Sequence, residues 1–358
     1  FWSGLSVFSK MLKNCSEDAM KAQEVKKSVV KAGIELMRSG LVARTWGNIS
    51  CRIDGESFAI TPSGRDYSSL KPEDIVEVKI KDLSYEGTVK PSTEKGIHGE
   101  VYKTFPDINF VIHTHQEYAS ALSASGLDVI PVPHECVSDI FSEKILFSRY
   151  ALPGTRSLRK NVAACLKKTK SNAIILKHHG ALCFGRDYEI SFKTAKALEG
   201  ICLNFINSMG GNISQATDCD NPPPPEINEI MNYITKEKGG SLIFCSNPQI
   251  IACSGIPSPL LPYLDDFAQI VGLKAKVCKD DEKEIIKALK NSSAALIKNT
   301  GALCWGIDKK DAEAVCMILK KNSTAYLTAR IFNNPRPINT IDSMLMRFVY
   351  LKKYSKLY

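Results

Sequence analysis

A short motif occurs twice in this chain, and it restricts the possible folds more than any other feature. Leu176–Gly185 reads LKHHGALCFG, and Ile297–Gly306 reads IKNTGALCWG. Each copy has an apolar lead-in and is followed by a predicted long helix. Upstream, the segment VIHTH at 111–115 aligns with IFCSN at 243–247. Because repeated supersecondary units fold alike, we predict two copies of one fold in this chain.

The predicted domain organisation follows from the repeat and from a proline run. The length of 358 residues is enough for two domains of roughly 150 residues. Asn221–Pro225 reads NPPPP, which stays extended and favours a linker. We predict a first domain at residues 17–215, a proline-rich linker at 216–228 and a truncated, degenerate repeat at 229–358. Phe1–Lys10 precede Met11 without a cap or an apolar period, and we expect them to be an upstream addition.

Composition narrows the class of protein. A hydrophobic content of 44% and a charged content of 24% are typical of a globular chain, and no run of about 18 apolar residues favours a membrane span. The net charge of +9 is spread over separate lysine pairs, which favours anionic metabolites over nucleic acid as partners. The 12 cysteines include no CxxC pair, so we expect reduced thiols and a cytoplasmic location.

Local periodicity predicts alternating helices and short strands in the first domain. Helices are expected at 16–37, 93–105, 118–125 and 187–209. Strands are expected at 49–53, 57–60, 75–79, 109–114 and 173–176.

The histidines point to a metal site in the first half, because all 6 lie between positions 98 and 179. His113 and His115 are two residues apart on a predicted strand, so both imidazoles lie on one face. A second apolar strand ends in His178-His179, and three imidazoles are typical ligands of zinc or a similar divalent ion. Either histidine of that pair could be the third ligand; we favour His179, which precedes Gly180.

The second copy lacks these groups, since Cys245, Asn247 and Thr300 stand where the first copy has His113, His115 and His179. We therefore expect it to be a structural or assembly module rather than a second active site.

Further polar residues precede the histidines. Glu94 follows Pro91-Ser92-Thr93, and it is either an acid at a helix start or a general base beside a metal. The loops 45–50 and 61–64, with the Ser92-Thr93 helix start, offer hydroxyls and backbone N–H groups that could hold a phosphate. Each of these loops taken alone could also be an ordinary turn or cap.

Residues from about 17 to 212 resemble the class II aldolase/adducin family. The resemblance rests on five motifs in order, which are Gly47–Ser50, Thr61–Gly64, Pro91–Glu94, His113–His115 and His179-Gly180, together with Tyr150 and Gly154-Thr155. It implies an α/β fold, a three-layer α/β/α domain with a mainly antiparallel central sheet, to which this chain adds a truncated degenerate repeat. It also implies a homo-oligomer with sites between subunits, and we expect the second repeat to act as a pseudo-subunit.

The resemblance also implies site residues and an activity. His113, His115 and His179 would bind Zn²⁺ or another divalent transition metal, and Glu94 would be the catalytic acid/base. The implied phosphate-binding residues are Thr45, Asn48, Ser63, Gly64, Ser92 and Thr93. The implied reaction is reversible cleavage of a ketose 1-phosphate to dihydroxyacetone phosphate and an aldehyde through a metal-stabilised enediolate.

This sequence departs from the family pattern at one position. His134 stands where sugar-phosphate aldolases often carry a tyrosine that donates a proton. A 4-epimerase or dehydratase acting at the same metal, or a non-catalytic adducin-like module, therefore remain alternatives.

Overall fold

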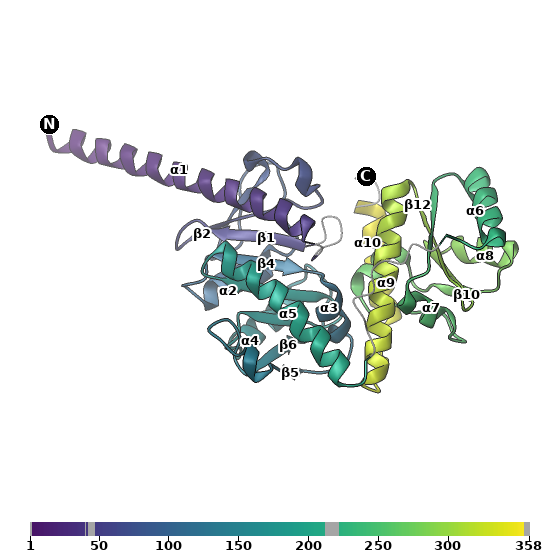
Figure 1. The fold of residues 1–358 in the computed structure, drawn as a ribbon. Coiled ribbons are helices and arrows are strands. Elements are labelled where there is room, and N and C mark those ends of the chain that lie inside the picture. The colour runs from purple at the N-terminus through teal and green to yellow at the C-terminus, as the bar shows by residue number, and fades with distance from the viewer. Residues whose placement is uncertain (1, 40, 42–46, 212–221, 354–358) are drawn as a thin grey trace.

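The computed structural model describes residues 2–39, 41, 47–211 and 222–353, which form two β-sheets with helices around each (Figure 1). The first sheet has eight strands in the order β3-β2-β1-β4-β8-β7-β6-β5. All neighbours in it are antiparallel except the parallel pair β6 and β7. Its strands are β1 (Gly47–Arg52), β2 (Ser57–Ile60), β3 (Val76–Lys79), β4 (Phe110–Thr114), β5 (Val129–Pro131), β6 (Lys144–Ser148), β7 (Ala173–Leu176) and β8 (Gly180–Gly185).

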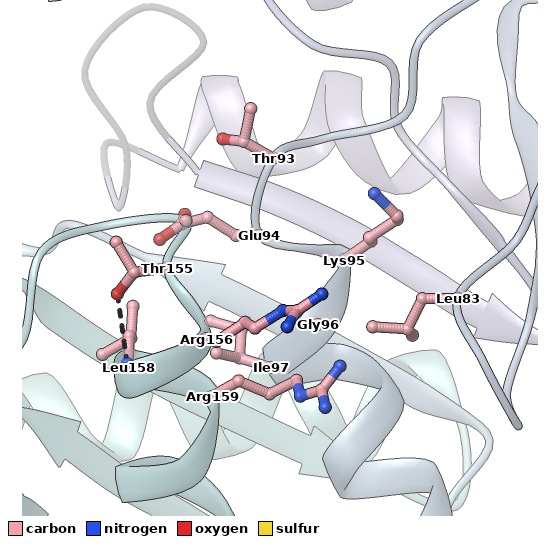
Figure 2. A pocket seen from close by; sticks show the side chains of 11 residues that line it. Leu83, Thr93, Glu94, Lys95, Gly96, Ile97, Thr155, Arg156, Leu158 and Arg159 are labelled. Atoms are coloured by element: carbon pink, nitrogen blue, oxygen red, sulfur yellow. Dashed lines mark hydrogen bonds between the residues drawn. The ribbon is translucent and has the colours of Figure 1, made fainter.

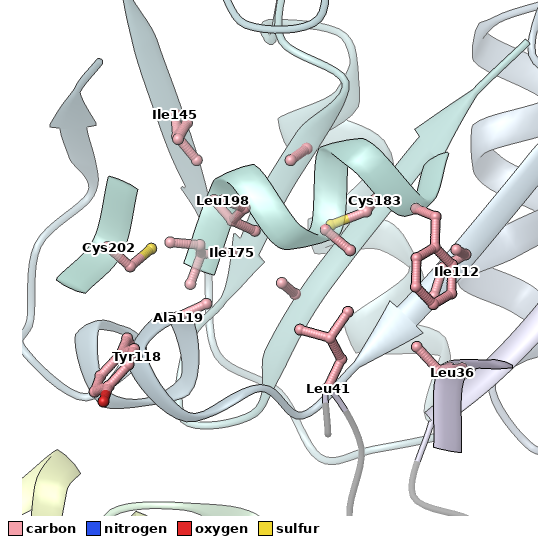
Figure 3. Packing of buried hydrophobic residues seen from close by; sticks show 14 of the residues in the cluster. Leu36, Leu41, Ile112, Tyr118, Ala119, Ile145, Ile175, Cys183, Leu198 and Cys202 are labelled. Atoms are coloured by element: carbon pink, nitrogen blue, oxygen red, sulfur yellow. The ribbon is translucent and has the colours of Figure 1, made fainter. Parts of the chain in front are cut away.

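Helices cover both faces of this first sheet, because its strands are apolar on both sides. On β4, Val111 belongs to one buried core and Ile112 to the other, as side chains alternate along a strand. The core around Ile112 is completed by α1 (Trp2–Arg38), α3 (Glu117–Ser123) and α5 (Tyr188–Ser208) (Figure 3). The core around Val111 is completed by α2 (Lys95–Thr104) and α4 (Arg156–Leu166). The first half is thus an α/β protein built on a mixed, mostly antiparallel sheet.

Most predicted elements lie within a few residues of the observed ones. The helix predicted at 16–37 is the exception, since α1 extends back to Trp2. An apolar period in the sequence predicts only a helix that has one apolar face. Leu5, Lys10 and Met11 lie outside such a period, but their residue types have a high intrinsic helix propensity.

A second, smaller sheet has the strand order β10-β11-β12-β9. Its strands are β9 (Ser241–Cys245), β10 (Lys276–Cys278), β11 (Ala294–Ile297) and β12 (Gly301–Gly306). The pairs β9–β12 and β12–β11 are antiparallel and β11–β10 is parallel, which are the directions of β4, β8, β7 and β6 in the first sheet. The helices of this half are α6 (Pro225–Lys238), α7 (Pro248–Ser254), α8 (Glu282–Leu289), α9 (Lys309–Ile331) and α10 (Thr340–Lys353), with a π-helical turn at Phe267–Val271.

Two features of the second half differ from expectation. Helix α6 begins at Pro225, inside the predicted linker 216–228, because a proline is well tolerated in the first turn of a helix. Cys245 and Cys316 form a disulfide, where reduced thiols were expected. Cys245 ends β9 and Cys316 lies on α9, and their Cα atoms are 6.4 Å apart. The two residues are separated by 71 positions, so the sequence does not reveal that they are close. The free cysteines among the side chains that the structure describes are Cys51, Cys136, Cys165, Cys183, Cys202, Cys253, Cys278 and Cys304.

Helix α9 runs between the two halves and packs against α3 (Figure 1). At this contact the Thr324 hydroxyl donates to Glu117 at 2.9 Å. No helix among the residues described is both long and apolar enough to cross a lipid bilayer.

Helix α3 is capped by a carboxylate from α5. Glu199 accepts hydrogen bonds from the backbone N–H groups of Tyr118 at 2.7 Å and Ala119 at 3.1 Å. Burial raises the pKa of Glu199 from 4.5 to about 7, although these two hydrogen bonds oppose the increase.

This pKa predicts a pH-dependent stability. Because the folded pKa of Glu199 lies above its unfolded value, its contribution is fully present below about pH 4.5 and is lost as the pH rises through about 7. We expect the Glu199→Gln variant to lose less free energy of unfolding than the wild type between about pH 5.5 and 8.5, by on the order of 1–3 kcal/mol. Urea unfolding at both pH values measures this difference. Glu189→Gln, an exposed change on the same helix, is the control and should retain the wild-type slope.

Candidate metal centre

Three histidines from two strand ends meet at one point. His113 is on β4, His115 follows β4, and His179 lies in the turn between β7 and β8. The Nε2 atom of His113 is 3.0 Å from that of His115 and 2.9 Å from that of His179. The three predicted imidazoles therefore converge on a single site.

A glycine allows this convergence. A Cβ atom at Gly180 would lie 2.2 Å from the Thr114 carbonyl oxygen, so only glycine lets the β7–β8 turn approach the end of β4 this closely. His178, the alternative third ligand, points elsewhere: its Nδ1 atom is 2.9 Å from the carbonyl oxygen of Tyr263. Of the two neighbouring histidines, His179 is the one that joins the cluster.

Glu94 is the fourth member of the cluster. It is the N-cap residue of α2, and its carboxylate oxygens lie 3.2 Å from His113 Nε2 and 3.0 Å from His179 Nε2. Its Oε1 atom is buried and accepts no hydrogen bond. One carboxylate oxygen and three imidazole nitrogens within 4.8 Å of one another suit a divalent metal ion.

The ring orientations favour metal binding through Nε2. The Nδ1–H group of His113 donates to the Ala181 carbonyl oxygen at 2.8 Å, and that of His179 donates to the Asp265 carboxylate. His115 Nδ1 lies 3.5 Å from Asp266 Oδ2. A proton on Nδ1 alone leaves the Nε2 lone pair free, so three neutral rings of this tautomer would direct three lone pairs to the same space. A cation in that space would relieve their mutual repulsion.

The electrostatics of the cluster also fit a cation. Burial raises the pKa of Glu94, but His113 and His179 outweigh it and hold that pKa well below its ordinary value. Burial lowers the pKa of His179, but Asp265 and Glu94 outweigh it and hold that pKa well above its ordinary value. Burial lowers the pKa of His115 to about 4, which keeps this ring neutral as a metal ligand requires. The carboxylates thus draw positive charge to the imidazoles.

A chain of buried hydrogen bonds orients Glu94. The Asn48 side-chain amide donates to Glu94 Oε2 at 3.1 Å, and its oxygen faces His98 Nε2. His98 Nδ1 is 2.7 Å from Ser50 Oγ, which is 2.7 Å from the Tyr102 hydroxyl. Burial lowers the pKa of His98 to about 3, so this ring is neutral and donates to Asn48 through Nε2. Asn48, predicted to bind phosphate, has both ends of its amide committed to these contacts.

The other predicted phosphate-binding residues lie on two adjoining loops, apart from Thr45, which lies outside the described residues. Ser63 N–H donates to the Lys90 carbonyl, and Ser92 N–H donates to that of Thr61, each at 3.0 Å. This pairing brings Ser63 and Gly64 beside Ser92 and Thr93. The Ser92 hydroxyl accepts from the Glu94 N–H group at 3.2 Å, which places these loops next to the candidate metal centre.

A pocket of about 140 Å³ opens beside Glu94, between the starts of α2 and α4 (Figure 2). Its lining includes Thr93, Lys95, Arg156 and Arg159. Arg159 is paired with Glu100, at 3.4 Å from Nε to Oε1. Lys95 and Arg156 are the other two charged side chains of this lining besides Glu94 and the paired Arg159.

His134 lies apart from this group. It is exposed on a short 3₁₀ turn, His134–Cys136, and no described contact joins it to the metal cluster.

Sequence reasoning did not identify three charged residues of the second half. Asp265, Asp266 and Lys321 all lie against the cluster, and all three are buried. The one available signal is the acidic pair in the otherwise apolar segment LPYLDDFA at 261–268. These contacts join the second half, which we expected to be a structural or assembly module rather than a second active site, to the candidate metal centre.

Comparison with known proteins identifies the family. The model of the class II aldolase and adducin N-terminal domain matches residues 27–206, which is half of the chain. The protein belongs to this family.

Solved structures similar to this chain include aldolases. An L-fuculose 1-phosphate aldolase is 28% identical and covers 60% of this chain and 96% of its own, with a TM-score of 0.49. The L-fuculose-1-phosphate aldolase from Thermus thermophilus is 25% identical and covers 53% of this chain and 98% of its own, with a TM-score of 0.43. YgbL from Klebsiella pneumoniae, described as a putative aldolase/epimerase/decarboxylase, is 23% identical and covers 54% of this chain and 93% of its own, with a TM-score of 0.46.

The cluster predicts metal-dependent stability. We expect the purified protein to carry about one divalent transition metal ion per chain, because the imidazoles converge on one point. Removal of the ion by a chelator should lower the Tm, and Zn²⁺ should restore it by mass action. Elemental analysis and thermal unfolding measure both effects. His115→Ala should abolish metal binding, whereas His134→Ala, the same change outside the cluster, should retain it.

Proposed function

We propose that this protein is a metal-dependent aldolase, a lyase that reversibly cleaves a ketose 1-phosphate to dihydroxyacetone phosphate and an aldehyde. The observation that carries the proposal is the convergence of His113, His115 and His179 beside an anionic, buried Glu94. Membership of a family rich in metal-dependent lyases and epimerases supports it.

The proposed metal is Zn²⁺ or another divalent transition ion, held by the three Nε2 atoms. When bound, such an ion supplies a positive charge that polarises a carbonyl and stabilises the negative charge that develops on its oxygen.

In this proposal Glu94 moves the proton. Its carboxylate is an anion, Oε1 has no hydrogen-bond donor, and Oε2 is held by the Asn48 amide. A carboxylate held in this way out of bulk water can take a proton from carbon and return it in the reverse reaction.

The substrate would be anionic. Ser63, Gly64, Ser92 and Thr93 are proposed to bind its phosphate, with Asn48 and Thr45 as further candidates from the sequence. Lys95 and Arg156 at the pocket beside Glu94 support a negatively charged substrate, since fixed cations favour anions over neutral sugars.

Because the resemblance implies sites between subunits, we propose that the exposed His134 donates a proton at the site of another copy.

We also propose that the second half is a degenerate copy of the aldolase-like fold. The matching strand order and directions support this. So do Asp187 and Asp308, which begin the helices after β8 and β12 with the same cap, accepting from Ile190 N–H and Asp311 N–H. In this proposal, residues 17–215 and 229–358 are the two units, and the second takes the place of a neighbouring subunit within a homo-oligomer. A solution mass equal to that of a monomer would contradict the oligomer.

The activity is tested by offering the metal-loaded protein a panel of ketose 1-phosphates. We expect release of dihydroxyacetone phosphate from at least one of them, measured by a coupled reduction.

His134 in place of a tyrosine favours a second candidate, a 4-epimerase or dehydratase at the same site. Conversion of a sugar phosphate to an isomer or to a product short of one water, without dihydroxyacetone phosphate, would establish that alternative instead.

Glu94→Gln separates metal binding from proton transfer. The variant retains the shape of the side chain and the three imidazoles, so we expect wild-type metal content. Loss of the base should lower kcat by about 10²- to 10⁴-fold. Lys103→Gln, an exposed change on α2, is the control for expression and folding. Wild-type turnover by Glu94→Gln would show that the base is another residue.

A further inference from the structure

We propose that the second half of the chain builds part of the candidate metal centre, with Asp265 and Asp266 as positioning residues for His179 and His115. This inference rests on the metal-binding part of the proposed function and not on the identity of the substrate.

Asp265 fixes the ring of His179. Its Oδ2 atom accepts the Nδ1–H group of that imidazole, and its side chain is completely buried. Its backbone N–H group donates to the His178 carbonyl at 3.0 Å. Both the main chain and the side chain of Asp265 therefore bind the turn between β7 and β8. A carboxylate on Nδ1 sets the tautomer and raises the basicity of Nε2 as a metal ligand.

Asp266 faces His115 on the other side of the cluster. Its Oδ2 atom is 3.5 Å from His115 Nδ1 and is paired with the Lys321 ammonium group of α9. Lys321 also donates to the His115 carbonyl oxygen at 3.3 Å. The lysine thus fixes both the carboxylate and the backbone of the ligand that it faces.

The segment that carries both aspartates is held by helix α9 of the same half. The Asn322 side-chain oxygen accepts from Tyr263 N–H at 2.8 Å and Leu264 N–H at 3.1 Å. The Asn322 amide donates to the Leu261 carbonyl at 3.0 Å. The backbone carbonyl of Tyr263 accepts from His178 Nδ1–H, which joins the segment to the first half. Helix α9 therefore delivers the aspartates through a series of buried hydrogen bonds.

The Lys321–Asp266 ion pair alone does not balance the charge of the three buried acidic residues. Glu94, Asp265 and Asp266 are three buried acidic residues, and Lys321 is the buried lysine among their contacts that the structure describes. Buried charges are costly unless they are compensated. A divalent ion held by the three imidazoles, in place of a second proton on His179, would supply further compensation. His113 needs no positioning residue from the second half, because its Nδ1–H group already donates to the Ala181 carbonyl of its own half.

The test compares metal affinity in variants of the full chain. Zn²⁺ affinity is measured by competition with a chromophoric chelator, and the visible spectrum of the Co²⁺-loaded protein reports ligand geometry. For Asp265→Ala we expect a Kd weakened about 10- to 100-fold and an altered Co²⁺ spectrum. Asp265→Asn retains an oxygen acceptor for the Nδ1–H group, so it should recover part of the affinity. Asp266→Asn should weaken binding in the same direction.

Asp281→Ala is the matched control. Asp281 caps α8 in the second half by accepting from Glu284 N–H at 2.9 Å, so its loss should lower the Tm but leave the Kd and the Co²⁺ spectrum unchanged.

The outcomes separate the two proposals. Folded Asp265→Ala with the wild-type Kd would overturn the positioning role and leave the metal site intact. If Asp265→Ala does not fold, the two asparagine variants provide the test. A Kd within about 2-fold of the wild type for both would overturn the positioning role, since loss of a hydrogen-bond partner of a metal ligand typically weakens metal affinity by more than this. A wild-type chain that takes up no metal overturns the proposed function together with the inference.

Discussion

The convergence of three imidazole Nε2 atoms is the interaction on which the rest of this structure depends. Lone pairs only 2.9–3.0 Å apart repel one another unless a cation lies between them or a proton is shared. The protein keeps them together by fixing the opposite nitrogen of two rings with hydrogen bonds and by leaving no side chain at Gly180. The sheet order that places β8 beside β4, and the cap position of Glu94 on α2, both bring groups to this point.

The two halves of the chain contribute different chemistry to this site. The family domain carries the histidines and Glu94, whereas the second half carries the aspartates that contact His179 and His115. Because a ligand that binds only the assembled site stabilises it, metal binding and docking of the two halves are expected to be thermodynamically coupled. The second half is then more than a support for the first.

The second sheet has the strand directions of the first without the histidines. Its acidic residues do not come from the positions equivalent to the metal ligands. Asp265 and Asp266 come from the segment after Leu260 and Lys321 comes from α9, and all three contact the first half.

The sequence alone determined the local elements and the identity of the candidate metal ligands. Strands such as Ser57–Ile60 and Ala173–Leu176 were predicted with their observed bounds, because period and turn residues are local properties. His113 and His115 were predicted on one face for the same reason. Only the tertiary structure decided that Asp265 meets His179 across 86 residues, that Lys321 reaches His115, and that Cys245 pairs with Cys316. These contacts depend on how α9 packs against α3 and against β9, and no local pattern in any one of these elements encodes how the others pack on it.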